Sequence, residues 1–272
     1  MEKIINTKIL DTRKIRKAKF ATSKKSLQML TCYDFQTAQM LNETEIDLLL
    51  IGDSAGNVVL GKETTVEVTL EEMIMLGAAV KRGAPNKFTV VDMPFGSYST
   101  FDDAITNATK LFKQTKCESI KVEGAFDYQL EIIKRLTQSG IPVMGHIGLT
   151  PQSVHELGGY FTHGKNKEDQ EKLMNEALNL QKAGCFAIVL ECVQEDISTQ
   201  ITKALNIPTI GIGAGQGTDG QVLVINDLLK MGPGTPPKFC TPISDLFQLK
   251  KELITTYLNN QRENDNAQLS HH

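Results

Sequence analysis

Tryptophan is absent from this sequence of 272 residues, and cysteine is scarce. The number of cysteines is odd and none of them forms a C-x-x-C pair, so neither a disulfide framework nor a structural zinc site is expected. We therefore expect reduced thiols in a cytoplasmic protein. The cysteines are Cys32, Cys117, Cys185, Cys192 and Cys240.

Long hydrophobic runs are also lacking. No stretch of about 18 apolar residues occurs, which predicts that the protein does not span a membrane. The formal net charge of −3 does not suggest the strongly basic face that a nucleic-acid partner needs. The start of the chain is basic but has no apolar segment of a secretory signal, so we expect a solvated helix face there. Its charges include Arg13, Lys14, Arg16, Lys17 and Lys19.

The sequence also lacks a linker between domains. The length would fit two ordinary domains, but no stretch rich in Pro, Gly or Ser separates two halves. A single (β/α)8 barrel of about 250 residues also matches the length, and the 40% of hydrophobic residues can form a sizeable core. We expect one domain over residues 1–272, with an N-terminal helical segment at about 1–25 and a C-terminal helical tail at about 243–272.

Short apolar runs recur along the chain. Several are continuous rather than alternating, such as LLLIG and FAIVL, and this is typical of strands that helices cover on both faces. We expect strands at Leu27–Cys32, Asp47–Gly52, Phe88–Asp92, Ser119–Glu123, Ile141–His146, Cys185–Glu191, Ile207–Ile212 and Gln221–Ile225.

Amphipathic stretches lie between most of these runs. A helix should run from a cap at Thr69 to Arg82, with Glu72 completing a capping box and Gly83 ending the helix. Alternating strands and helices predict a parallel sheet, and eight strands favour a closed (β/α)8 TIM barrel. The other expected helices are Phe101–Lys116, Asp127–Ser139, Lys167–Ala183, Glu195–Leu205 and Ile243–Arg262.

Acidic residues gather at the predicted strand ends, where barrel enzymes carry their catalytic groups. An Asp or Ser after a strand often caps the next helix instead, and a lone His there is often a core residue. Carboxylates that converge on one barrel mouth would repel one another, and a bound cation offsets that cost. Carboxylate oxygens favour Mg²⁺ over zinc. The residues are Asp53, Asp92, Glu123 and Glu191, with His146 among them.

Two further features keep alternative interpretations open. Lys121 precedes Glu123 by two residues, so both side chains share one strand face. Lys121 could pair with a substrate carboxylate, form a Schiff base or make a salt bridge to a neighbouring acid. The glycine-rich segment Gly211–Gly215 could bind an anion through its backbone or simply form a tight turn.

Several segments resemble the ketopantoate hydroxymethyltransferase family. They occur in order from about Phe20 to Phe239, and the run GHIGLTPQS is the most specific of them. The matching segments are Thr31–Asp34, Ile51–Ser54, Arg82–Pro85, Asp92–Phe95, Lys121–Gly124, Gly145–Ser153, Leu190–Cys192 and Gly211–Gly215.

This resemblance implies a TIM barrel of the phosphoenolpyruvate/pyruvate type in a cytoplasmic homo-oligomer, often a decamer. It implies transfer of a hydroxymethyl group from 5,10-methylenetetrahydrofolate to 3-methyl-2-oxobutanoate, forming 2-dehydropantoate in pantothenate (coenzyme A) biosynthesis. It also implies Mg²⁺-assisted enolisation. The implied roles are Mg²⁺ binding by Asp53, Asp92 and Glu123; binding of the 2-keto acid by Asp53, Ser54, Asp92, Lys121 and His146; and proton abstraction by Glu191.

Three alternatives share parts of this pattern. A Mg²⁺-dependent lyase or mutase of the isocitrate-lyase or phosphoenolpyruvate-mutase kind would use the same metal and keto-acid chemistry, but it would normally bring a catalytic Cys-rich loop that the sequence lacks. An aldolase could form a Schiff base on Lys121. An assembly protein that has kept an old barrel would show no Mg²⁺-dependent turnover.

Overall fold

The computed structural model describes residues 10–20 and 26–269, with side chains as far as Glu263. It contains two compact units, the first ending at Leu223 and the second beginning at Val224. The single domain expected over residues 1–272 stays a prediction. Parts of the expected N-terminal segment, residues 1–9 and 21–25, lie outside the described residues.

The first unit is built on a closed barrel of parallel strands, in chain order β1 to β8. The barrel closes where β1 pairs with β8, from Leu27 opposite Gly220 to Leu30 opposite Leu223. The predicted (β/α)8 barrel is therefore confirmed. The strands are β1 Leu27–Thr31, β2 Leu48–Ile51, β3 Phe88–Asp92, β4 Ser119–Glu123, β5 Val143–Gly148, β6 Ala187–Glu191, β7 Thr209–Ile212 and β8 Gly220–Leu223.

Proline explains two of the differences from the predicted strand bounds. The strands β5 and β7 each begin two residues later than expected, just after Pro142 and Pro208. Proline has no N–H to donate to a ladder, although the carbonyls of both prolines accept a bond from the neighbouring strand. The bounds of β3 and β4 match the prediction residue for residue.

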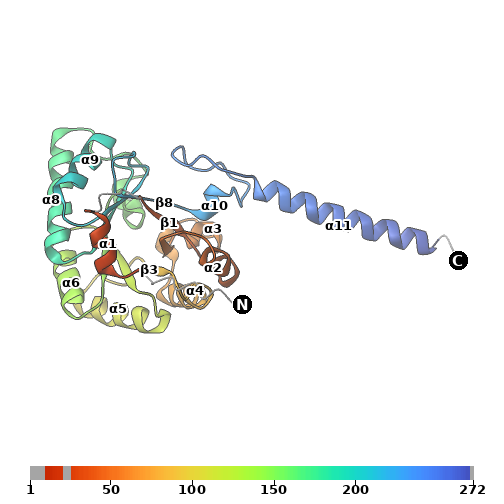
Figure 1. Cartoon of the computed structure of the whole chain (residues 1–272), viewed down its shortest axis with the longest axis horizontal. Coiled ribbons are helices and arrows are strands. Elements are labelled where there is room, and N and C mark those ends of the chain that lie inside the picture. Colours follow the sequence, from red (N-terminus) through yellow and green to blue (C-terminus); the bar gives the residue numbers. More distant parts are fainter. Residues whose placement is uncertain (1–9, 21–25, 270–272) are drawn as a thin grey trace. The chain divides into compact units, whose positions relative to one another are not determined.

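Helices surround the strands of the barrel (Figure 1). The expected capping box at Thr69 is present, because Thr69 and Glu72 each accept a bond from the backbone N–H of the other. The described helices of the first unit are α1 Thr12–Ala18, α2 Phe35–Asn42, α3 Ala55–Val58, α4 Leu70–Gly83, α5 Phe101–Thr115, α6 Asp127–Gln138, α7 Val154–Leu157, α8 Lys167–Ala183 and α9 Glu195–Ala204, with 3-10 turns η1 Thr65–Glu67 and η2 Pro151–Ser153.

Gly83 has a different role from the expected one. It is the last residue of α4 rather than a stop after it. A Cβ at Gly83 would lie 2.4 Å from the Phe35 carbonyl oxygen, so the missing side chain lets α4 pack closely on α2. The helix α2, which was not predicted, is capped by the Asp34 side chain at Thr37 N–H.

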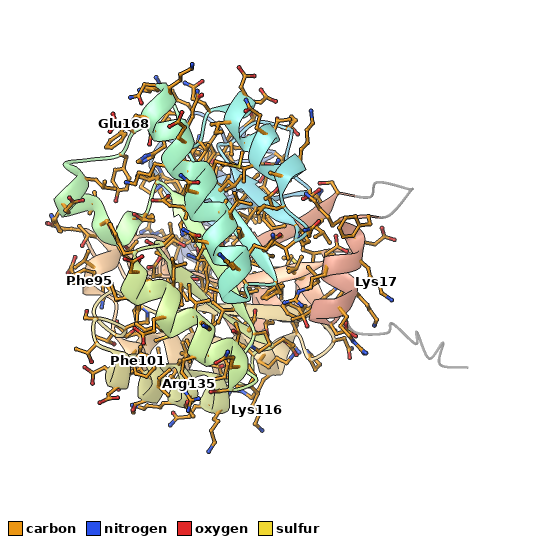
Figure 2. All side chains as sticks on the ribbon, turned by 90° about the vertical axis from the view of Figure 1, so that its left-hand side faces the viewer. Lys17, Phe95, Phe101, Lys116, Arg135 and Glu168 are labelled. Atoms are coloured by element: carbon orange, nitrogen blue, oxygen red, sulfur yellow. The ribbon has the colours of Figure 1, made fainter. Side chains whose placement is uncertain are left out.

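The base of the barrel is closed by α1, against the expectation of a solvated helix face alone. Ile15 is fully buried in the apolar cluster inside the barrel, and Lys19 forms a salt bridge of 2.8 Å with Asp219. Figure 2 shows Lys17 of α1 at one end of the barrel and Phe95, in the loop after β3, at the other. The helices α5, α6 and α8 lie along the side between these ends.

The second unit contains α10 Ile225–Leu228 and α11 Leu246–Leu269. The start of α11 and the residues just before it are joined to the end of α10 by backbone hydrogen bonds. The N–H groups of Ile243 and Leu246 donate to the carbonyls of Leu228 and Leu229. Large apolar side chains remain exposed on and just before α11: Ile243, Phe247, Leu249, Leu253, Ile254, Tyr257 and Leu258. In the described part of the chain, no helix is both long and apolar enough to cross a bilayer.

Candidate active site

Five neighbouring strands bring their polar residues to one mouth of the barrel, as predicted. Inside a parallel barrel, side chains two residues apart face the same way, so the groups on β3 to β6 lie in the inward-facing rows, while those of β2 lie in the loop after the strand. All of the following except Glu191 and Ser54 are almost fully buried. Asp53 and Ser54 follow β2, Asp92 ends β3, Lys121 and Glu123 lie on β4, His146 lies on β5, and Glu191 ends β6.

Lys121 lies at the centre of these groups. Its Nζ is 3.2 Å from Asp92 Oδ2, 3.5 Å from Glu123 Oε1 and 3.1 Å from His146 Nδ1. Burial opposes the charged form, but the carboxylates of Asp92 and Glu123 outweigh it and raise the pKa of Lys121. The side chain is therefore an ammonium group that neutralises part of the acidic mouth.

Asp53 and Asp92 form the part of the mouth that best fits a cation. The Asp53 N–H donates to Asp92 Oδ2 at 3.1 Å, while Asp92 Oδ1 is buried without a hydrogen-bond partner. Burial raises the pKa of both carboxyl groups, and the charge of Asp92 raises that of Asp53 further. A cation would satisfy the orphaned oxygen and reverse this cost.

Both carboxylate oxygens of Glu123 have polar partners. Its Oε2 accepts a bond of 3.2 Å from the Gln152 N–H, and its Oε1 lies 3.2 Å from His146 Nδ1. Burial opposes its charged form, but His146 and Lys121 outweigh it and lower the pKa of Glu123 to about 2. Among the described residues, no three His, Cys, Asp or Glu side chains are grouped to hold a metal ion. Mg²⁺ commonly takes one or two protein carboxylates and completes its shell with water and substrate, and Asp53 and Asp92 could serve as such ligands.

His146 connects Glu123 to Glu191. Its Nε2 lies 3.3 Å from Glu191 Oε2 but makes no hydrogen bond. Burial and Lys121 oppose protonation, but Glu123 and Glu191 outweigh them and raise the pKa of His146 to about 9. His146 therefore lies between two carboxylates, which favour its protonated form.

Glu191 and Ser54 do not cap the helices that follow them. The N-cap of α9 is Gln194, and Glu191 is partly exposed at the mouth. Ser54 precedes α3 but makes no capping bond, and its Oγ lies 2.8 Å from the Tyr33 hydroxyl instead. Neither the Glu191 nor the Ser54 side chain is used for capping, so both are available to a ligand.

The backbone around Glu191 is held unusually tightly. Gly148 has φ of 92°, and a Cβ there would lie 2.3 Å from the Glu191 carbonyl oxygen, so only glycine permits this approach. Cys192 has φ of 49°, a left-handed conformation that is unfavourable for a residue other than glycine. Bonds of 2.8 Å from Cys192 N–H to Ile212 and from His163 N–H to Cys192 hold this conformation in place.

A family model for ketopantoate hydroxymethyltransferase matches residues 10–266. This match covers nearly the whole chain. The chain belongs to the ketopantoate hydroxymethyltransferase family. Its relatives include the 3-methyl-2-oxobutanoate hydroxymethyltransferase of Leptospira interrogans, 46% identical over 86% of this chain and 89% of that protein. The enzyme of the same name from Thermotoga maritima is 47% identical over 86% of this chain and 87% of its own.

Several solved structures with little sequence similarity have the same fold as this chain. A phosphoenolpyruvate phosphomutase from Streptomyces platensis subsp. rosaceus has a TM-score of 0.64 at 11% identity, covering 93% of this chain and 88% of that one. A phosphonopyruvate hydrolase in complex with oxalate and Mg²⁺ has a TM-score of 0.58 at 10% identity, covering 78% and 80%. At such identities the likeness supports the barrel architecture alone.

The sequence analysis did not identify some of the polar residues at the mouth. Gln152 lies in the GHIGLTPQS run, which was used only as a resemblance, while Tyr98 and Tyr33 carried no assigned role. The glycine-rich segment Gly211–Gly215 ends β7 and continues as a bend, and its possible binding of an anion stays a prediction. Gly215 has φ of 73°, and a Cβ there would lie 2.4 Å from the Glu195 side chain.

Proposed function

We propose that this protein transfers a hydroxymethyl group from 5,10-methylenetetrahydrofolate to 3-methyl-2-oxobutanoate, forming 2-dehydropantoate in pantothenate biosynthesis. The names of relatives at 43–47% identity support this substrate. The observation that carries the chemistry is the buried cluster of Asp53, Asp92 and Glu123 around the Lys121 ammonium, with Glu191 at its partly exposed edge.

The reaction begins with a proton next to a ketone, which is too weakly acidic for an unaided carboxylate. Asp53, Asp92 and Glu123 would hold Mg²⁺, and a bound Mg²⁺ would supply positive charge that stabilises the developing enolate. Lys121 adds a second positive charge close to the same place. Ser54 and His146 would contact the keto acid from either side of this charge.

Glu191 is the proposed base. Its Oε2 lies 3.3 Å from His146 Nε2 at the partly exposed edge of the mouth, where a carboxylate can accept the C3 proton of the keto acid. Over the whole reaction, both bonds from the methylene carbon of the folate to nitrogen break, a bond from that carbon to C3 forms, and the protons from C3 and from water end on the two folate nitrogens. Water supplies the hydroxyl oxygen of the product.

The Schiff-base alternative is disfavoured by the charge on Lys121. A Schiff base requires a neutral amine, and the neighbouring carboxylates raise the pKa of Lys121. Borohydride reduction in the presence of 3-methyl-2-oxobutanoate should leave no adduct. An adduct mapped to Lys121 would move the protein to the aldolase class.

We also propose a cytoplasmic homo-oligomer, a decamer if it follows the resemblance. Among the described residues of the second unit, the large apolar side chains of α11 are exposed, Leu253 and Tyr257 by about three-fifths each. Burying such a face against another copy would be favourable. Light scattering of the full chain, and of a chain ending before Asp245, would show whether α11 carries the assembly.

The deciding test of the chemistry is hydrogen exchange at C3 of 3-methyl-2-oxobutanoate in D₂O without folate, followed by NMR. We expect exchange that requires both the protein and Mg²⁺, and product only when 5,10-methylenetetrahydrofolate is added. Failure of exchange with every divalent cation tried would contradict the proposed enolisation.

A further inference from the structure

Gln152 joins four neighbouring strand ends at the mouth. It lies in η2 after β5, and it is 5% exposed. Its backbone N–H donates to Glu123 Oε2 at 3.2 Å, and its Nε2 donates to Asp53 Oδ2 at 2.7 Å and to the Met93 carbonyl at 2.9 Å. Its Oε1 accepts a bond from the buried Tyr98 hydroxyl.

These partners determine the orientation of the amide. The Met93 carbonyl can only accept, so the amide nitrogen must face it, and a flipped amide would set two acceptors against each other. The same nitrogen therefore donates to Asp53 Oδ2. Because Oε1 can only accept, the Tyr98 hydroxyl must be the donor in the remaining bond.

One residue thus holds one oxygen of each of two carboxylates. Asp53 is held through the side chain of Gln152 and Glu123 through its backbone, while Glu123 Oε1 stays turned toward Lys121 and His146. Without these bonds, Asp53 would lose the side-chain donor that fixes its Oδ2, and Glu123 would be held on Oε1 alone. Residues that orient ligands in this way commonly tune metal affinity strongly.

We propose that Gln152 is a positioning residue that holds Asp53 and Glu123 in the orientation that binds a divalent cation, and that Tyr98 holds Gln152 in turn. The inference rests on the metal site of the proposed function. It assigns to Gln152 no contact with the reacting atoms, and it predicts an effect on cation binding before any substrate is present.

The test measures Mn²⁺ binding to the free protein from the electron paramagnetic resonance signal of unbound Mn²⁺. Mn²⁺ accepts the same oxygen ligands as Mg²⁺. Gln152→Met keeps the length of the side chain and removes its amide group, so the bond to Asp53 is lost while the backbone bond to Glu123 stays. We expect its Mn²⁺ affinity to fall by about 10–100-fold, and its C3–H exchange to recover in large part when Mg²⁺ is raised.

Tyr98→Phe tests the outer bond without disturbing Gln152 directly. It should weaken Mn²⁺ binding in the same direction by a smaller factor, and it decides the matter if Gln152→Met does not fold. Gln221→Met is the matched control, because the Gln221 Nε2 also donates two bonds, to Gly215 and Thr218, but touches no carboxylate. Its Mn²⁺ affinity should equal that of the wild type.

The outcomes separate this inference from the proposed function. A wild-type protein that binds no Mn²⁺ would overturn the metal site and this inference together. Normal binding by the wild type and equally by Gln152→Met would overturn this inference alone, as would unchanged binding by Tyr98→Phe where Gln152→Met cannot be folded. Equal losses in Gln152→Met and Gln221→Met would also overturn it, because general loosening of the barrel would then explain both.

Discussion

The base and the mouth of the barrel interior are equally buried but chemically opposite. On β3, the inward row runs from Phe88 through Val90 to Asp92, and none of the three is more than 2% exposed. At the base, Phe88 meets Phe186 edge-on with ring centroids 5.6 Å apart. At the mouth, Asp92 has an oxygen with no partner. Burial alone therefore does not distinguish a stabilising layer from a reactive one.

The two layers differ in how burial changes the free energy of the folded state. Removing apolar side chains from water at the base is favourable by about 25 cal/mol per Å². Removing carboxylates from water at the mouth is unfavourable unless they are paired, and one ammonium and one imidazolium group partly compensate the cluster. The base should therefore supply stability and the mouth reactivity, and mutations in each layer should affect one property more than the other.

Glu191→Gln should give the largest effect, and it should act on chemistry alone. The variant keeps the shape of the side chain but cannot accept a proton, so C3–H exchange in D₂O should fall by about 10²–10⁴-fold. Affinity for 3-methyl-2-oxobutanoate should change little. A loss that high Mg²⁺ restores would instead identify Glu191 as a metal ligand.

Phe88→Ala should produce the complementary result at the base. The lost ring leaves a cavity beside Phe186, and the free energy of unfolding in urea should drop by about 3–5 kcal/mol. Exchange measured per folded molecule should stay near the wild-type rate. If Phe88→Ala instead slowed exchange while leaving stability intact, the division between the two layers would be wrong.

Removal of Mg²⁺ should have a moderate effect on stability. A ligand that binds only the folded state at about 100 times its Kd adds about 2.7 kcal/mol, so chelation should lower the melting temperature. Asp92→Asn should abolish this response and the Mg²⁺-dependent exchange. In the absence of Mg²⁺, it should be no less stable than the wild type, because one buried like charge is gone. A clear loss of stability without Mg²⁺ would contradict the idea that the mouth is costly.

Cys192→Gly should have the smallest effect on stability. Glycine relieves the left-handed conformation but adds backbone freedom to the unfolded chain, and the two contributions should nearly cancel to within about 1 kcal/mol. Exchange should still slow, because Glu191 is next to the loosened residue. Lys116→Gly is the matched control, since Lys116 has φ of 60° at the exposed end of α5 (Figure 2) and should leave exchange unchanged.

The sequence was sufficient for the barrel and for the charged residues of its rim. Both depend on local patterns, namely continuous apolar runs and the residue that follows each of them, and a parallel barrel gathers those residues without further information. The starts of β5 and β7 were placed too early because the apolar pattern continues through Pro142 and Pro208, which cannot donate to a ladder.

Other features depend on partners that are distant in the chain. Gln152 and Tyr98 are 54 positions apart, and nothing near either residue signals their hydrogen bond. Ile15 is one apolar residue in a basic segment, so no periodicity marked it as the residue that closes the base. The roles of the individual rim residues and the metal set likewise stay predictions, because they concern ligands that the fold alone does not specify.

The seam at which β1 meets β8 has a consequence for the kinetics of folding. It joins Leu27 to Gly220, so its closure carries the greatest loop entropy of any strand pairing in the barrel. The acidic rim spans β2 to β6, which are consecutive and can pair before the ring closes. We expect the repelling carboxylates to meet early and the seam to form late. Mg²⁺ should then accelerate refolding as well as shift its equilibrium.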